Sequence, residues 1–147
     1  MRIDIHVSTV NPGFTGFFER SGIATSVAHQ LIVRDLVAWA KESVESQLVA
    51  NPGLRTELAE RAIEAQVEAL ISYRIISMQE RGEIPNKESS IAKLYSSELD
   101  VRLAVTGMHL SGMFGQLENR EDPRGLGGRL ARFYLHSTTD RKSTRLN

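Results

Sequence analysis

The stretch at residues 86–110 constrains the fold most strongly, because its apolar side chains keep a helical spacing over about seven turns. Pro85 ends the segment before it, Asn86 is a suitable N-cap, and Glu88 places an acid in the first turn. Small residues recur between the large ones and would allow neighbouring helices to approach closely. The stretch therefore predicts the central helix of a bundle, with an apolar stripe made by Ile91, Leu94, Tyr95, Val101, Val105 and Met108.

Two earlier segments also have helical periodicity. The first runs from about residue 23 to 49, ends at an Asn-Pro-Gly turn, and carries an apolar stripe of Ile23, Val27, Ile32, Leu36, Trp39 and Ala40. The second runs from about residue 54 to 81, with Gly82 as its C-cap, and its predicted core face holds Ile63, Val67, Leu70, Ile71, Ile75 and Met78. Tyr73 is interpreted as a further core residue. Arg74 interrupts this face, and we expect it to pair with a buried acid such as Glu98.

These segments, followed by a polar loop and a last short helix at about residues 129–137, predict an all-α fold. Short turns rich in Pro and Gly between long helices favour an antiparallel up-down helical bundle, with three long helices plus a short fourth. Three broad apolar faces normally need a full fourth helix. That helix is then either missing or supplied by another chain.

Residues 1–10 alternate loosely between apolar and polar side chains, a pattern typical of a strand. A single strand without a partner is unstable. It is therefore either an isolated remnant or part of a sheet that lies upstream in a longer protein.

Composition excludes several classes of function. The formal net charge is zero, so no nucleic-acid partner is expected, and no apolar run is long enough for a membrane span. No signal-peptide pattern begins the chain, which makes a cytoplasmic location the expectation. There is no cysteine for thiolate chemistry. No metal site is expected, because none of the histidines follows the Glu-x-x-His pattern of di-iron bundles: His6, His29, His109 and His136.

Glu19 is the candidate catalytic residue. It directly follows Phe17 and Phe18, and apolar surroundings raise the pKa of a carboxyl group, as a general base near neutral pH requires. The alternative is an ordinary acid at a helix N-terminus, stabilised by the helix dipole.

Four segments resemble the C-terminal helical domain of the acyl-CoA dehydrogenase family. Residues 88–99 (ESSIAKLYSSEL) resemble its E-x-S-x-A-K-L-x-x-S-E-L helix, and residues 110–117 (LSGMFGQL) resemble the L-x-G-x-x-G-Q-L turn after it. Residues 18–24 (FERSGIA) resemble the E-R-x-G-I-A start of the domain, and residues 133–137 (FYLHS) resemble the segment before its final helix. Their order and spacing fit the family over about residues 12–139.

The resemblance implies an enzyme that binds FAD and an acyl-CoA. A glutamate removes the α-proton, the β-hydride passes to the flavin, and an electron-transfer flavoprotein accepts the electrons. Glu19 matches one of two positions that the base occupies in the family, with Arg20 beside it as an orienting residue. Residues 1–11 would then be the tail of a missing middle β-domain. Such enzymes are homo-oligomers or paired heteromeric subunits.

The chain departs from the family pattern at three places. Residues 46–54 stand where the family has an R-x-Q-F-G loop that contacts FAD across the dimer, so no cofactor-binding residue is assigned. The chain stops before the G-T-x-E-I-Q-R-N motif, so we expect a fragment that lacks the last helix and is inactive alone. Residues 140–147 fit nothing in the family and are interpreted as a non-native tail.

Two other hypotheses remain open. One is a non-catalytic, FAD-poor partner subunit or helical interaction module of a heteromeric acyl-CoA dehydrogenase. The other is a free-standing helical bundle unrelated to flavoenzymes.

Overall fold

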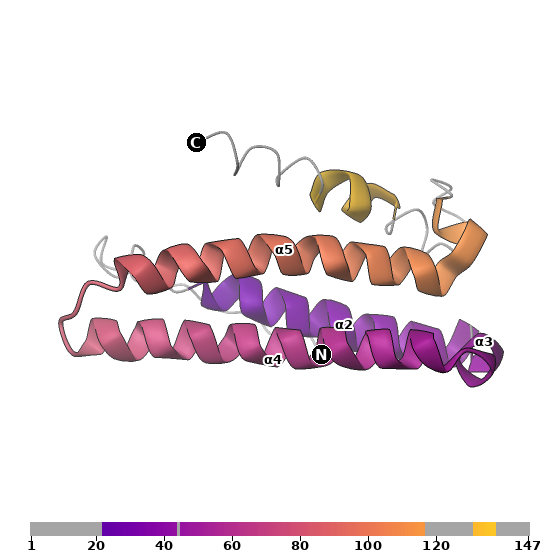
Figure 1. Cartoon of the computed structure of the whole chain (residues 1–147), viewed down its shortest axis with the longest axis horizontal. Coiled ribbons are helices and arrows are strands. Elements are labelled where there is room, and N and C mark those ends of the chain that lie inside the picture. Colours follow the sequence, from indigo (N-terminus) through magenta and orange to yellow (C-terminus); the bar gives the residue numbers. More distant parts are fainter. Residues whose placement is uncertain (1–21, 44, 117–130, 138–147) are drawn as a thin grey trace, which may run out of the picture.

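The computed structural model of the chain describes residues 22–43, 45–116 and 131–137. Within these ranges every regular element is a helix, and there is no strand. In Figure 1 the three long helices lie side by side and alternate in direction, and the short helix at residues 131–137 lies along α5. The predicted antiparallel up-down bundle is confirmed. Its elements are α2 (Ile23–Ser43), α3 (Glu45–Ala50), α4 (Pro52–Glu80), α5 (Asn86–Ser111) and the 3-10 helix η1 (Gly112–Gln116).

The turns between the helices follow from local chemistry. Asn51 caps α4, because its side-chain oxygen accepts a hydrogen bond from the Gly53 backbone N–H at 3.0 Å. Gly82 ends α4 with a φ of 77°, a left-handed conformation that favours glycine. The cap of α5 differs from the prediction: Asn86 is its first helical residue, and Pro85 occupies the cap position without a side-chain hydrogen bond.

The core forms two clusters along the bundle. One lies toward the α3 end and is built by Leu36, Trp39, Ala40, Leu58 and Leu110. The other lies at the middle of α5 and is built by Val33, Ala65, Leu99 and Leu103, with Phe133 of the short helix packed against it. Phe133 therefore positions the short helix against α5.

The predicted core face of α4 was largely wrong. Ile63 is 64% exposed and Leu70 is 66% exposed, and Tyr73, interpreted as core, is also exposed. Only Ile75 of that face is fully buried. Besides Leu58 and Ile75, the buried face carries small and polar side chains: Arg61, Ala65, Glu68, Ala69 and Ser72. Small side chains let α2 approach closely, Glu68 pairs with His29 of α2, and Arg61 pairs with Glu60 and Glu64 of α4 itself.

In the first turns of α5, too, the buried face differs from the predicted one. Ile91 and Leu94 are exposed, whereas Ala92, Leu99, Leu103 and Ala104 are buried. The strand predicted at residues 1–10 and the tail at residues 140–147 lie outside the described residues.

Truncation of Leu103 tests this assignment of the core. Leu103→Ala removes a side chain with 0% exposure and should lower the free energy of unfolding by about 2–5 kcal/mol, because it leaves a cavity. Leu94→Ala on the same helix, at a position 59% exposed, should change it by about 0.5 kcal/mol or less. Urea unfolding followed by circular dichroism measures both. Equal losses would show that the face of α5 is misassigned.

Candidate functional site

The N-terminal end of α2 is the described segment that follows the predicted base most closely in the sequence. Glu19 and Arg20 lie outside the described residues, so their catalytic roles stay predictions. Gly22, three positions after Glu19, has a φ of 69°, and a Cβ built there would lie 3.7 Å from Ser72 Oγ on α4. Ser26 is fully buried and donates a hydrogen bond to the Ile23 carbonyl oxygen. The start of α2 is thus seated directly against α4.

His29 connects the three long helices at their centre. Its Nδ1 lies 2.6 Å from Glu68 Oε2 on α4, and its Nε2 lies 2.8 Å from Asp100 Oδ1 on α5. His29 and Glu68 are each 2% exposed, whereas the Asp100 side chain is 34% exposed. One imidazole on α2 therefore holds a carboxylate from each of the other two helices.

The two contacts determine the protonation state of His29. A ring nitrogen can only donate to a carboxylate, so both nitrogens must carry a proton. Burial alone lowers the pKa of the imidazole, but the hydrogen bonds to Asp100 and Glu68 outweigh it and raise the pKa to about 9. His29 is therefore a cation at neutral pH. Without a free lone pair it can act neither as a metal ligand nor as a general base.

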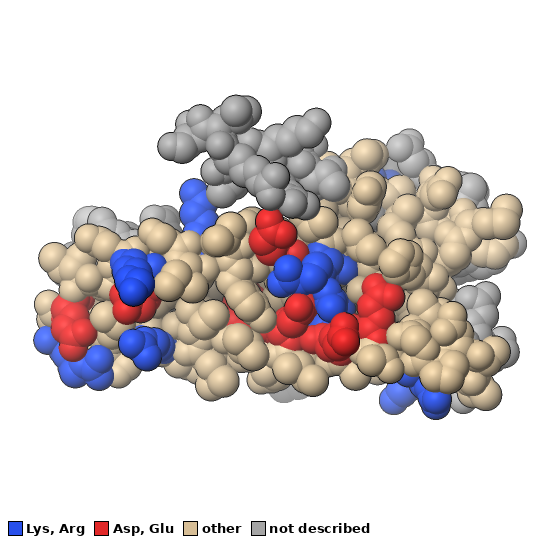
Figure 2. Space-filling model, in the orientation of Figure 1, with Lys and Arg blue, Asp and Glu red and all other residues tan. Residues whose placement is uncertain are grey.

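The contact between α4 and α5 continues this polar character. We use the term polar seam for Glu57, Arg61 and Glu64 of α4 together with Arg102, Thr106 and His109 of α5. In the seam Thr106 Oγ1 donates to Glu57 Oε1 at 2.8 Å, and Arg102 Nε lies 3.1 Å from Glu64 Oε1. Figure 2 shows acidic and basic side chains gathered over the boundary between these two helices. Charged pairs thus align α5 on α4 where the sequence predicted apolar packing.

Arg74 does not pair as predicted. Its side chain is 71% exposed, and its Nη2 lies 4.0 Å from Glu88 Oε1 at the start of α5. The predicted burial of Arg74 was wrong, because the face that carries it points outward from the bundle.

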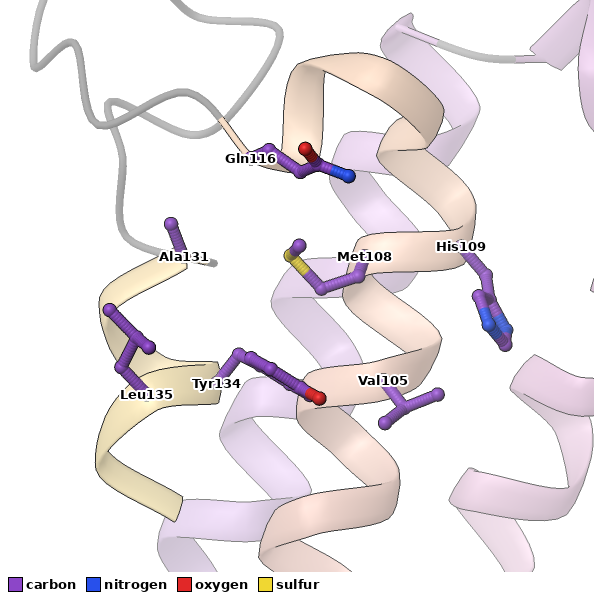
Figure 3. A pocket seen from close by; sticks show the side chains of 7 residues that line it. All are labelled: Val105, Met108, His109, Gln116, Ala131, Tyr134 and Leu135. Carbon is purple, nitrogen blue, oxygen red and sulfur yellow. The ribbon is translucent and has the colours of Figure 1, made fainter. Parts of the chain in front are cut away.

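A hollow of about 460 Å³ lies between α5, η1 and the short helix. In Figure 3 Met108 and Tyr134 point into the space between α5 and the short helix, whereas the His109 ring points away from the short helix. Among the described residues the lining is mostly apolar and includes no Lys or Arg: Val105, Met108, His109, Gln116, Ala131, Tyr134 and Leu135. Such a lining suits an apolar group. It does not fit the charged pyrophosphate of FAD, so no FAD site is assigned to these residues.

Two further kinds of site are absent from the part of the chain that the structure describes. Across the described ranges, no group of three or more acidic or histidine side chains could hold a metal ion. None of the helices described here has the length and apolarity needed to cross a membrane.

The sequence profile described as "Acyl-CoA dehydrogenase, C-terminal domain" matches residues 18–141. The chain therefore belongs to the acyl-CoA dehydrogenase family, through its C-terminal domain. A protein of Bacillus subtilis (strain 168) named acyl-CoA dehydrogenase is 26% identical over 118 residues, which are 78% of this chain and 30% of that protein. The chain spans about a third of the length of this curated relative. No solved structure gives a significant match.

Substitution of His29 tests its structural importance. His29→Leu should lower the free energy of unfolding by about 3–5 kcal/mol, because it leaves Glu68 buried without its cationic partner. His109→Leu is the matched control, since its side chain is 55% exposed and an exposed pair contributes about 1 kcal/mol or less. Urea unfolding at pH 7 measures both variants. If His29→Leu lowers the free energy of unfolding no more than His109→Leu does, His29 does not have the structural importance assigned to it.

The raised pKa also predicts that stability falls at alkaline pH. The pKa of His29 is raised from 6.5 to about 9, so its stabilising contribution is complete below pH 6.5 and is lost as pH rises through 9. The difference corresponds to about 3 kcal/mol. Unfolding free energies measured at pH 6, 7.5 and 9.5 should decline accordingly in the wild type. In His29→Leu the unfolding free energy should decline much less over the same pH range. An equal decline in the wild type and the variant would show that a group other than His29 titrates.

Proposed function

We propose that this chain contributes the C-terminal helical domain to a flavin-dependent acyl-CoA dehydrogenase. The observation that carries the proposal is the family match over residues 18–141. The three long antiparallel helices are consistent with it. The domain then acts within a larger protein, with residues 1–11 as the tail of a preceding β-domain and residues 140–147 as a non-native tail.

Glu19 is the proposed general base in this enzyme. The proton next to the thioester carbonyl of an acyl-CoA is acidic enough for a carboxylate to remove, and aromatic neighbours such as Phe18 would raise the carboxylate pKa toward neutrality. Support comes from the described chain that follows it: Gly22 lies against Ser72 of α4, and Ser26 in the first turn of α2 is fully buried. An anchored helix that begins four positions after Glu19 would help to hold the base in place relative to the substrate. Arg20 is proposed to orient it.

FAD is the proposed cofactor, and it supplies the hydride acceptor when bound. No FAD site is assigned among the described residues, so its binding groups are proposed to come from the other domains. We further propose an acyl-CoA substrate, an electron-transfer flavoprotein as electron acceptor, assembly into an oligomer, and a cytoplasmic location.

A second candidate function is that of an FAD-poor partner subunit in a heteromeric enzyme. The observation that favours it lies between α2 and α4, where the family's R-x-Q-F-G loop is replaced. This region holds the short helix α3 and the Asn51 cap, and its only charged residue is Glu45. A subunit of this kind would shape the assembly without performing the chemistry.

Substitution of Glu19 tests the first proposal in the full-length protein. Glu19→Gln should lower kcat for acyl-CoA-dependent dye reduction by about 10²–10⁴-fold, the usual contribution of a general base. Glu80→Gln, an exposed acid at the end of α4, is the control and should leave kcat unchanged. An active enzyme that is insensitive to Glu19→Gln would exclude Glu19 as the base.

The flavin spectrum separates the two candidates. A full-length protein that purifies with a bound flavin absorption band and reduces dye with acyl-CoA supports the enzyme. A protein that is colourless alone but forms a yellow, active complex with a second subunit supports the partner-subunit function.

A further inference from the structure

The first half of α2 is held in the bundle differently from its second half. We use the term leading half for residues 23–32, which begin four positions after Glu19. Within the leading half only Ser26 and His29 are buried, and both are polar. Buried apolar side chains begin in the second half, with Val33, Leu36, Trp39 and Ala40. The end of α2 that follows the proposed base therefore has no fully buried apolar side chain.

His29 connects the leading half to the rest of the bundle. The hydroxyl of Ser26 donates a hydrogen bond to a carbonyl oxygen of its own helix, so this bond does not reach a neighbouring helix. His29 instead contacts Glu68 of α4 at 2.6 Å and Asp100 of α5 at 2.8 Å. Ile32, at the end of the leading half, adds a partly buried apolar contact with the core clusters. One imidazole therefore joins the leading half to both neighbouring long helices.

The two hydrogen bonds of His29 restrict the rotation of α2 as well as its position. Hydrogen bonds depend on direction, whereas apolar packing does not. If the first turns of α2 rolled or tilted, at least one bond from the ring to α4 or α5 would lengthen. Ile23 lies six residues before His29, which is about 9 Å along a helix. A change of tilt at the ring therefore displaces the end of α2 that follows Glu19.

We propose that His29, held between Glu68 and Asp100, is a positioning residue for the reaction: it fixes the leading half of α2 and thereby the segment that carries Glu19. The inference rests on the proposed role of Glu19 as the general base. His29 takes no part in the chemistry itself, because carboxylates occupy both of its ring nitrogens. Misplacement of a catalytic group by about 1 Å can lower the rate by about 10²-fold, so a residue that holds the base affects kcat.

The protonation of His29 makes this positioning depend on pH. Among the described residues, the charged groups that face the ring are Glu68 of α4 and Asp100 of α5, while Arg34 and Asp35 of α2 pair with each other. The two carboxylates raise the pKa of His29 to about 9, so the ring carries both protons below that pH and loses one above it. A neutral ring can donate to only one carboxylate. The leading half therefore loosens as the pH rises through about 9.

Substitution of Asp100 in the full-length enzyme tests the role of His29 without removing a buried group, since the Asp100 side chain is 34% exposed. Asp100→Asn should lower the pKa of His29 by about one unit or more, because it removes an adjacent opposite charge. The alkaline limb of kcat against pH should move to lower pH by the same amount, while KM for the acyl-CoA stays nearly unchanged.

Two variants serve as controls for this pH profile. Asp100→Glu keeps the carboxylate and should retain the wild-type alkaline limb. Asp35→Asn removes an acid that is 57% exposed on the same helix as His29, and it should leave the limb in place. An alkaline limb that does not move in Asp100→Asn, or a change confined to KM, would overturn the proposal.

Distances between spin labels test the positioning without any enzymatic activity. The chain has no cysteine, so labels can be attached to introduced cysteines in Ser21→Cys combined with Leu94→Cys on α5. Electron paramagnetic resonance of the 147-residue chain should give a narrow distance distribution at pH 7.5, and a broader one at pH 10 or after Asp100→Asn. The control pair, Arg34→Cys with Leu94→Cys, reports the second half of α2, which the apolar core holds, and should stay narrow. Equal behaviour of the two pairs would contradict the role of His29.

The two experiments separate a failure of the base from a failure of the positioning residue. If Glu19→Gln leaves kcat unchanged while the label at position 21 responds to Asp100→Asn, the base is misassigned, but the positioning of the leading half by His29 is upheld. If Glu19→Gln abolishes turnover while neither the alkaline limb nor the label responds to Asp100→Asn, Glu19 remains the base and the proposal for His29 is overturned.

Discussion

The placement of one protonated imidazole between two carboxylates determines how the three helices of this chain face one another. His29 reaches Glu68 at 2.6 Å and Asp100 at 2.8 Å, and Glu68 is almost completely buried. A buried carboxylate without a partner would be strongly unfavourable, so α4 must turn its polar face toward α2. The polar seam likewise requires α5 to turn Arg102, Thr106 and His109 toward α4. Electrostatic pairing thereby selects which face of each helix is inside.

The consequence is a bundle whose α4 has large apolar side chains on the outside. Ala65 and Ala69 permit close packing against α2, while Ile63 and Leu70 remain exposed. In a helix with two usable faces, satisfied buried polar groups and small-residue packing can outweigh the burial of a few large apolar side chains. The exposed face is then available for assembly. This is consistent with a domain that functions as part of a larger protein, as the family match suggests.

Much of the fold could be predicted from the sequence, because Pro and Gly end helices by local chemistry. Asn51-Pro52-Gly53 at the start of α4, Gly82 after its end and Pro85 before α5 all mark boundaries that the structure confirms. The buried face of α4 could not be predicted, because periodicity identifies the apolar stripes of a helix but not the one that is buried. The His29 contacts were missed because their partners lie 39 and 71 positions away. Charges at positions 57, 61, 64 and 68 of one helix were the available signal. Glu19 and Arg20 remain predictions.

The protonation of His29 is the most direct measure of this account. Nuclear magnetic resonance of the chain with ¹⁵N-labelled histidine reports both ring nitrogens of His29 as a function of pH. If His29 joins the helices as a cation, both nitrogens carry protons at pH 7.5 and the ring titrates near the pKa of about 9 that its surroundings produce. A neutral His29 ring at pH 7.5, titrating near the ordinary value of 6.5, would contradict it.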